Sequence, residues 1–228
     1  MNRKVITLSF DDGVRQDARL IELLKKYGLK ATFNLNSGKF GECLDLGPAN
    51  NHVRHDKWRA EEVRDVYEGM EVAAHTVTHP DLKTLSRTRI LEEVICDYMR
   101  LSELVGYEVV GMAYPGGPPN YNSLVTETIR ENTRIVYARA VQSTYRFDFP
   151  EDYMVWRPTV HLLDPAVERL TEEFRSIQGD ALFYVWAHSY ELDIHSAWEQ
   201  TEKLLAGLSG IEGVSYLTNR EVFVNFRL

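Results

Sequence analysis

Short hydrophobic runs alternate along the chain with longer segments in which hydrophobic residues recur every three to four positions. The short runs predict buried strands over residues 5–10, 31–35, 71–74, 109–113, 135–140, 181–187 and 214–217. The longer segments predict helices over residues 16–27, 57–68, 85–104, 122–130, 165–176 and 197–208. This alternation is typical of a parallel sheet, and about seven such units predict a (β/α) barrel. We expect one domain spanning residues 1–228, because no linker, repeat or low-complexity segment divides the chain.

One segment without periodicity, residues 36–56, interrupts this pattern. It is rich in Gly, Asn and His, and it predicts a long loop. Loops of this length in compact domains are usually functional or disordered. His52 and His55 lie in this loop, and we favour a position at the rim of a pocket or in solvent over one at a metal ion.

Polar residues stand at or just after the ends of five predicted strands. The catalytic residues of a barrel lie where its strands end, on the loops that lead to the helices. Five polar clusters that obey this one rule favour a common site. They are Asp11 with Asp12, His75, the turn at residues 115–117, Arg139 and His188.

Two of these clusters carry the side chains of a metal site. Asp11 and Asp12 are adjacent, and His75 and His79 are separated by three residues. One Asp and two His are the ligand set of an open catalytic metal site, in which a further position is left for water. The second Asp would accept a proton from that water. Since Pro80 disfavours a helix at His79, we expect the two histidines on a short turn. The four side chains together predict a metal-dependent hydrolase.

Charge narrows the range of partners. The chain has 228 residues, of which 44% are hydrophobic and 26% charged, as in ordinary globular proteins. Its formal net charge of −8 argues against nucleic acid or an anionic membrane as the main partner, because both require a basic face. The net charge neither favours nor disfavours the binding of a neutral substrate.

The cysteines and the lengths of the hydrophobic segments indicate the cellular compartment of the protein. Cys43 and Cys96 form no CxxC motif and predict no disulfide framework, and we expect Cys96, within the predicted helix 85–104, to be a small core residue. No apolar segment is long enough for a signal peptide or a membrane span. We therefore expect a cytoplasmic protein.

Four motifs together resemble those of the polysaccharide deacetylase family, also called carbohydrate esterase family 4 or the NodB homology domain. They are residues 8–13 (LSFDDG), 75–79 (HTVTH), 114–117 (YPGG) and 183–188 (FYVWAH). The resemblance extends over nearly the whole chain. It implies a distorted (β/α) barrel with about seven parallel strands. It also implies a hydrolase that removes acetyl groups from amino sugars with a divalent metal ion, most often Zn²⁺, with Co²⁺, Ni²⁺ or Mn²⁺ as alternatives.

The resemblance also implies roles for individual residues. Asp12, His75 and His79 would hold the metal, and Asp11 would be the general base that helps metal-bound water to attack the acetyl carbonyl. His188 would protonate the departing amine as general acid. The backbone N–H of Gly116 would bind the oxyanion, and Tyr114 in the same turn would contact substrate.

Two departures from the family pattern leave positions to be filled. Where the family usually has an arginine that orients the catalytic Asp, this chain has Ala113, and we favour Arg139 over Arg157 as the replacement because Arg139 stands at a strand end. No partner for His188 is obvious, and Glu191 and Asp193 are both candidates.

His161 stands near a further strand end and is a candidate substrate contact. Trp156, Trp186 and Trp198 are either core residues or a surface on which a sugar ring stacks.

Three hypotheses for the function remain. The first is a deacetylase acting on a small N-acetylated carbohydrate or glycan precursor. The second is a hydrolase of a non-sugar amide, such as a cyclic imide or ureide, on a related barrel. The third is a catalytically inactive sugar-binding relative. The sequence does not predict an oligomeric state.

Overall fold

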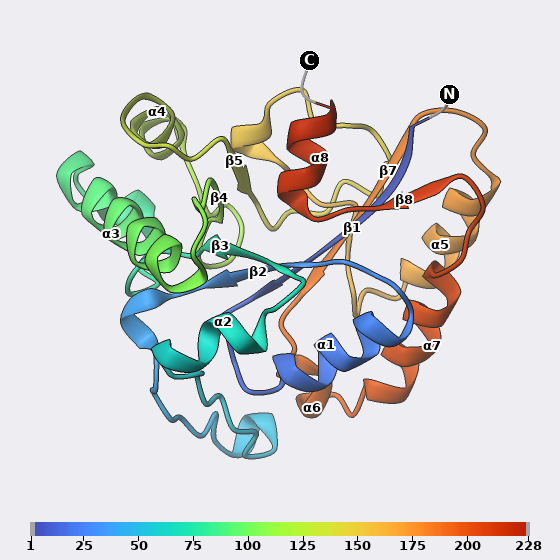
Figure 1. Ribbon diagram of the computed structural model, residues 1–228, viewed down its shortest axis with the longest axis horizontal. Coiled ribbons are helices and arrows are strands. Elements are labelled where there is room, and N and C mark those ends of the chain that lie inside the picture. The colour runs from blue at the N-terminus through green and yellow to red at the C-terminus, as the bar shows by residue number, and fades with distance from the viewer. Residues whose placement is uncertain (1–2, 227–228) are drawn as a thin grey trace.

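Eight strands form one curved sheet in the computed structural model, which describes residues 3–226 (Figure 1). Every pair of neighbouring strands is parallel, and the order is β5-β4-β3-β2-β1-β7-β6, with β8 also paired with β1. The strands are β1 (Lys4–Asp11), β2 (Thr32–Leu35), β3 (Glu71–Ala74), β4 (Gly111–Ala113), β5 (Tyr137–Arg139), β6 (Val160–His161), β7 (Ala181–Ala187) and β8 (Val214–Tyr216). This arrangement confirms the α/β barrel predicted from the sequence.

The barrel is distorted at two places. Trp156 pairs with Arg139 of β5, and the chain then continues into β6, which pairs with β7, so residues 156–161 link the two edges of the sheet. β8 and β2 pair with the same side of β1, β8 with its first residues, Lys4–Ile6, and β2 with its last. β1 is longer than either of these neighbours, and its carboxyl end lies beside the short strand β2.

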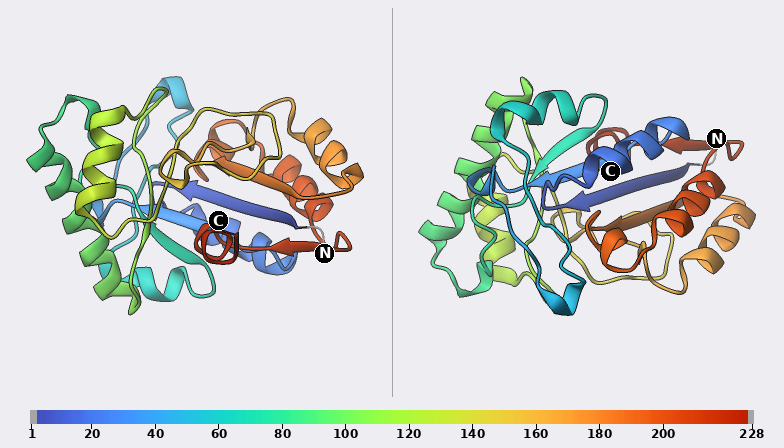
Figure 2. Two further views of the ribbon diagram at one scale, coloured as in Figure 1. Left: turned by 90° about the horizontal axis from the view of Figure 1, so that it is seen from above. Right: turned by 90° about the horizontal axis from the view of Figure 1, so that it is seen from below.

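Helices cover the outside of the sheet (Figures 1 and 2). α3 and α4 lie on one side of β1, and α5 and α7 lie on the other. The helices are α1 (Asp17–Lys26), α2 (Val63–Val66), α3 (Arg87–Val105), α4 (Ser123–Asn132), α5 (Val167–Ser176), α6 (Glu191–Ile194), α7 (Trp198–Leu208) and α8 (Asn219–Phe226). The longest, α3, begins at Ser86, whose side chain accepts a hydrogen bond from the Arg89 N–H, and ends at Gly106, which has a left-handed φ of 78°.

The prediction of a helix over residues 57–68 was wrong in its length. Only Val63–Val66 is α-helical, after a 3₁₀ turn at Ala60–Glu62. Lys57 instead forms an antiparallel bridge with Val14, and its buried side chain points toward the end of β1. This tertiary contact outweighs the local preference for a helix.

The expectation for Cys96 was also wrong, since its side chain is exposed. The inner face of α3 carries Ile90, Val94 and Leu101 together with two buried acids, Glu93 and Asp97. Cys96 lies on the outer face of α3, away from both the hydrophobic residues and the buried acids. Three elements, β6, α6 and α8, were not predicted, and β6 and α6, with two and four residues, are too short to show a period.

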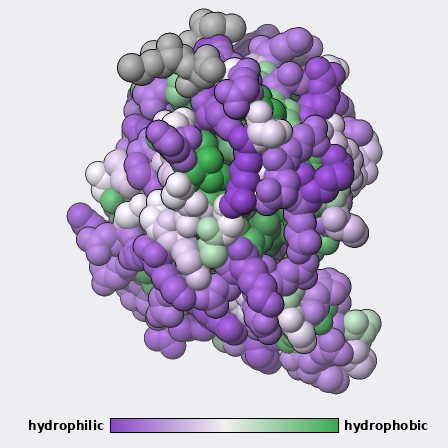
Figure 3. Space-filling view, turned by 90° about the vertical axis from the view of Figure 1, so that its right-hand side faces the viewer, coloured by the Kyte–Doolittle hydropathy of each residue, from purple (hydrophilic) through white to green (hydrophobic). Residues whose placement is uncertain are grey.

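The core has two parts. A large cluster lies between the helices and the outer face of the sheet, and a smaller one inside the barrel contains Val5, Tyr137, Trp156, Leu182, Tyr184 and Val222. On the face shown in Figure 3, hydrophilic residues predominate and hydrophobic ones are visible mainly in recesses between them. Among the described residues, no helix combines the length and hydrophobicity needed to cross a lipid bilayer.

Gly111 on β4 makes the inner packing testable. A Cβ placed there would lie 1.9 Å from Tyr137 Cζ, and the buried Tyr137 hydroxyl donates a 2.6 Å hydrogen bond to Glu71 Oε1. We expect Gly111→Ala to displace this ring and lower the free energy of unfolding by about 1–3 kcal/mol, measured by urea denaturation. Gly117→Ala is the control, since a Cβ at Gly117 meets no atom within 4 Å. Equal stability of the two variants would contradict this account of the packing.

Candidate active site and metal centre

A cavity of about 290 Å³ lies at the carboxyl ends of the strands. Asp11 ends β1, His75 follows β3, Tyr114 follows β4 and His188 follows β7. The structure thus brings together the polar residues that the strand-end rule grouped. The cavity is lined by Asp11, Asp12, His75, His79, Tyr114, Gly116, Gly117, Pro118, Val141, Trp186, His188 and Tyr190.

Asp12, His75 and His79 converge at one edge of this cavity. They each offer one ligand atom, and these atoms all lie within 4.8 Å of one another. His75 and His79 are on a turn rather than a helix, and the Thr76 hydroxyl accepts a 3.1 Å hydrogen bond from the His79 N–H. The Asn36 side chain donates to the carbonyls of His75 and Thr76. Loop and turn together hold two imidazoles and a carboxylate in the arrangement of a three-ligand ion site.

The backbone of this edge is strained. Asp12, Thr76 and His79 have φ values of 83°, 67° and 60°, in the left-handed region that favours glycine. Non-glycine residues there cost about 1–3 kcal/mol each and persist only where the surroundings impose them. Two of the three are candidate ligands, so the fold imposes an unfavourable backbone conformation at the positions that would hold the ion.

The imidazole of His75 is held in one orientation. Its Nδ1–H donates to the Ala113 carbonyl at 2.9 Å, which leaves Nε2 free to face the cavity. Its backbone N–H donates to Asp97 Oδ2 at 2.9 Å, from the inner face of α3. Burial lowers the pKa of His75 to about 4, so the ring is neutral at pH 7, as a metal ligand must be.

Two side chains, those of His55 and Lys57, contact Asp12. His55 Nε2 lies 3.3 Å from Asp12 Oδ2, and Lys57 Nζ lies 3.3 Å from Oδ1 and donates to the Asp12 carbonyl at 2.5 Å. Burial alone would raise the pKa of Asp12, but the hydrogen bond from His55 and the charges of Lys57 and His188 hold it well below the usual range. Asp12 is therefore ionised. His55 contacts a candidate ion ligand from outside the cavity lining, while His52 faces solvent beside Asp45.

Asp11 is a buried carboxylate with two fixed partners. Arg139 Nη2 forms an ion pair with its Oδ2, and Asn34 Nδ2 donates to its Oδ1 at 2.8 Å. Burial acts to raise the pKa of Asp11, yet the charge of Arg139, with a smaller contribution from His188, outweighs it and the pKa is lowered. The guanidinium also lies over the Trp186 ring, 4.5 Å from its centroid.

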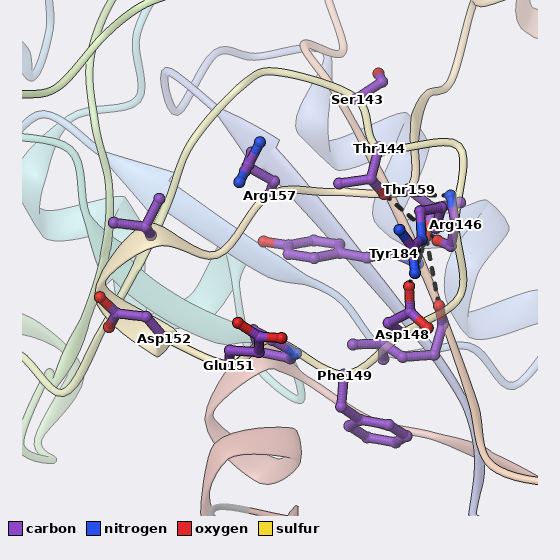
Figure 4. Close-up of a pocket in the computed structure, with 13 residues that line it drawn as sticks. Ser143, Thr144, Arg146, Asp148, Phe149, Glu151, Asp152, Arg157, Thr159 and Tyr184 are labelled. Carbon is purple, nitrogen blue, oxygen red and sulfur yellow. Dashed lines mark hydrogen bonds and ion pairs between the residues drawn. The ribbon is translucent and has the colours of Figure 1, made fainter.

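The two candidate arginines have different places. Arg139 is fully buried beside Asp11, whereas Arg157 lines a separate cavity of about 690 Å³ formed by residues 143–159 with Leu182 and Tyr184 (Figure 4). That cavity is larger, but it shares no lining residue with the one that contains the acids and histidines. Only Arg139 is therefore placed to orient Asp11.

His188 faces the two aspartates from the opposite wall. Its Nε2 lies 3.9 Å from both Asp11 Oδ2 and Asp12 Oδ2, and its Nδ1 lies 3.2 Å from Glu191 Oε2. Burial acts to lower the pKa of His188, but the adjacent Glu191 carboxylate and the two nearby aspartates raise it to about 9. The ring is therefore cationic at pH 7. The other candidate acid, Asp193, contacts Gln16 and Trp198 instead.

The turn at residues 115–117, called the glycine turn below, forms part of the cavity wall. Gly116 has a φ of 84°, and its backbone N–H has no hydrogen-bond acceptor among residues 3–226. Tyr114 contributes its ring to the cavity, but its hydroxyl donates to the Met154 carbonyl at 2.8 Å. Gly116 therefore keeps a free donor at the cavity wall, and the Tyr114 hydroxyl is engaged elsewhere.

Three residues of the site were not predicted from the sequence. Asn34 is a polar residue within the apolar strand β2, and that break in the pattern is a signal that could have been used. Lys57 gave no signal, because it stands in a segment predicted as helix. Tyr190 packs its ring near those of His55 and His188, with centroids 4.6 and 5.1 Å away. His161, expected as a substrate contact, lies outside the cavity lining and contacts Glu191.

Comparison with known sequences places this site in a family. The family model described as polysaccharide deacetylase matches residues 1–134, more than half of the chain. The chain belongs to the polysaccharide deacetylase family. The matched residues of this family member include the aspartates, the two histidines and the glycine turn, whereas Arg139, His161, His188 and Glu191 lie beyond them.

Curated relatives of this polysaccharide deacetylase family member match over limited lengths. It is 28% identical over 109 residues to a bifunctional xylanase/deacetylase from Pseudobutyrivibrio xylanivorans, covering 47% of this chain and 16% of the relative. It is 26% identical over 153 residues to a probable peptidoglycan-N-acetylglucosamine deacetylase from Arthroderma benhamiae, covering 66% and 32%. The chain thus spans a third or less of the length of these two relatives.

Solved structures share the fold over nearly the full length. The Xyl-CE4 domain of a multidomain xylanase from the hindgut metagenome of Trinervitermes trinervoides aligns with a TM-score of 0.59 and 21% identity, over 98% of this chain and 91% of that domain. A family 4 acetyl xylan esterase from Clostridium thermocellum, in complex with a cobalt ion, aligns with a TM-score of 0.54 and 15% identity, over 97% and 91%. At these identities the likeness shows the fold alone.

Replacement of Arg139 tests the buried ion pair. In Arg139→Met the Asp11 carboxylate loses its cation, and we expect a loss of about 3–5 kcal/mol in the free energy of unfolding at pH 8. In the wild type the lowered pKa of Asp11 contributes stability that is present above pH 4 and lost in stronger acid. In the variant burial dominates and raises that pKa, so the deficit should shrink as the pH falls from 8 to 5.

Urea denaturation at pH 5 and pH 8 measures this difference. Arg157→Met is the matched control, and we expect it to change the free energy of unfolding by less than about 0.5 kcal/mol at either pH. A deficit in Arg139→Met that does not depend on pH would show that the lost stability comes from packing rather than from the charge on Asp11.

Proposed function

We propose that this chain is a metal-dependent deacetylase that hydrolyses the N-acetyl group of an amino sugar. One observation supports this most strongly: a three-ligand set, a buried carboxylate and a cationic imidazole surround the same 290 Å³ cavity. Membership of the polysaccharide deacetylase family supports the acetyl group as the target. The two named relatives are a bifunctional xylanase/deacetylase and a probable peptidoglycan-N-acetylglucosamine deacetylase.

Asp12, His75 and His79 fit one divalent ion. Two neutral imidazoles and an ionised carboxylate suit Zn²⁺ best, and Co²⁺, Ni²⁺ or Mn²⁺ would also accept this donor set. Three protein ligands leave room for water and substrate, as in catalytic rather than structural sites. An ion bound there would act as a Lewis acid that acidifies water and polarises the acyl oxygen.

Asp11 is suited to act as the general base. It is ionised at neutral pH, and Arg139 and Asn34 hold both of its oxygens in place. A base fixed in this way accepts a proton from water with little reorganisation. Arg139 thus does the work for which the family pattern uses an arginine at the position of Ala113.

Other residues that line the cavity supply the remaining groups. The free N–H of Gly116 would donate to the acyl oxygen as negative charge develops on it. His188 carries a proton at neutral pH and would give it to the departing amine, because an amide does not release an unprotonated amine anion. Trp186 and Tyr190 line the cavity and would contact the sugar ring.

The substrate is proposed to be a small carbohydrate or glycan precursor. The cavity volume of about 290 Å³ is at the low end for small-molecule sites and suits one sugar unit better than several. The net charge of −8 gives no attraction for an anionic polymer.

The ligand assignment has a direct test. We expect His75→Ala and His79→Ala each to lose the bound metal, because two remaining donors hold a divalent ion weakly, while the fold is kept. Elemental analysis gives the metal content, and circular dichroism reports the fold. His52→Ala, at an exposed histidine, should keep one metal per chain. Full metal content in both site variants would disprove the assignment.

The base assignment is tested by Asp11→Asn. We expect this variant to keep its metal but release acetate from an N-acetylglucosamine oligosaccharide about 10²–10⁴-fold more slowly, since it cannot accept the proton. Enzymatic detection of acetate measures the rate. A wild type that binds metal and hydrolyses cyclic imides or ureides, but no N-acetyl sugar, would replace the proposal by the non-sugar amide hydrolase.

A further inference from the structure

His161 lies behind the cavity wall, yet it contacts the same carboxylate oxygen as His188. Glu191 Oε2 is 3.1 Å from His161 Nε2 and 3.2 Å from His188 Nδ1, and it accepts a 2.9 Å hydrogen bond from the His188 backbone N–H. All three side chains are half-buried. One carboxylate oxygen therefore joins two imidazoles, only one of which reaches the cavity.

The tautomer of the His161 ring is set by a backbone hydrogen bond. The Leu163 N–H donates to His161 Nδ1 at 3.3 Å, so Nδ1 is the acceptor and Nε2 carries the proton. Nε2–H then donates to Glu191 Oε2. This is the tautomer in which His161 acts as a hydrogen-bond donor to the carboxylate.

The position of His161 is set by the sheet rather than by a loop. His161 is the last residue of β6, and it pairs in register with Trp186 of β7. The two rings pack edge to face with centroids 4.7 Å apart, and the Trp186 ring lies 5.6 Å from that of His188. β6 thus provides a rigid support for the hydrogen bond to Glu191.

Glu191 requires such a support. It is the first residue of α6, a helix of four residues, and its side chain is 24% exposed. A carboxylate in this situation has alternative rotamers in solvent, and holding it in one costs side-chain entropy. The hydrogen bond from His161 favours the rotamer in which Oε2 also accepts from the His188 backbone N–H and lies 3.2 Å from His188 Nδ1 as an ion-pair partner. His188 then presents Nε2 to the cavity, 3.9 Å from the two aspartates.

We propose that His161 is a positioning residue for the general acid: it holds Glu191 so that His188 keeps its Nε2–H directed at the leaving amine. This inference rests on the proposed function. It concerns residues beyond the segment that matches the family model, 1–134. No proton passes through His161; it fixes the carboxylate that forms an ion pair with the His188 ring.

The leaving group distinguishes positioning from a general structural role. An amine must be protonated as it leaves, whereas a nitrophenolate leaves without a proton, so only amide hydrolysis depends on a well-placed His188. Damage to the fold, the metal or Asp11 would instead slow both reactions. The probes are an N-acetylglucosamine oligosaccharide and 4-nitrophenyl acetate.

We expect His161→Phe to lower kcat for the amide about 10–100-fold, as loss of a supporting hydrogen bond at a catalytic site commonly does. The rate for the ester should change less than about threefold, because its leaving group needs no acid. KM for the amide should be unchanged, since His161 does not line the cavity. His161→Gln should recover most of the amide rate, because its side-chain N–H also donates to Glu191.

Two controls complete the design. His52→Phe, at an exposed position, should leave both rates unchanged. In a double-mutant cycle, His161→Phe should add little to Glu191→Gln, because both remove the same support. Additive effects of the two substitutions would overturn the proposal.

The remaining outcomes separate this inference from the function on which it rests. Amide and ester rates that fall equally in His161→Phe, with the wild type active on both, would overturn the positioning role and leave the deacetylase intact. Two metals per wild-type chain, with one lost in His161→Phe, would also overturn it, because Glu191, His161 and His188 would then form a second ion site. A wild type that binds metal but hydrolyses no N-acetyl sugar would remove the proposed function itself.

Discussion

The buried ion pair between Asp11 and Arg139 is the interaction on which the site depends. A carboxylate without exposure to water is stable in its charged form only with a fixed cation and hydrogen-bond donors beside it. Arg139 supplies the cation from β5, across the barrel from β1, and Asn34 supplies a donor from the neighbouring strand. The distance between strands β1 and β5 is therefore constrained by charge as well as by packing.

Charges in the cavity depend on one another. Asp11 and Asp12 both remain ionised because Arg139 and Lys57 lie beside them, and the two aspartates in turn help His188 to stay protonated. His75, held by a backbone carbonyl and fully buried, stays neutral a few ångströms away. Two imidazoles of the same site are thus kept in opposite charge states, as the proposed roles of ion ligand and proton donor require.

Much of this arrangement could be predicted from the sequence, because barrels place reactive residues at strand ends. The ends of β1, β3, β4, β5 and β7 identified the aspartates, the histidines, the glycine turn and Arg139. The supporting residues could not be predicted in the same way. Lys57 and Asp97 are charged residues that look solvent-exposed in a helical pattern, and only the tertiary fold buries them against Asp12 and His75. The elements β6 and α6 are too short to leave a period, and with them the contact between His161 and Glu191 stayed hidden.

The division of the site between the two parts of the chain has a consequence for how its specificity can change. The candidate ion ligands and the proposed base lie within the first 134 residues, whereas the proposed acid and its partners lie on β6, just after β7 and on α6. Water activation would rest mainly on the first stretch and protonation of the leaving group on the second, with Arg139 of the second stretch paired with the proposed base. Substitutions around the proposed acid, away from Arg139, would therefore alter the preference for leaving groups of different basicity while the candidate ion ligands stay unchanged.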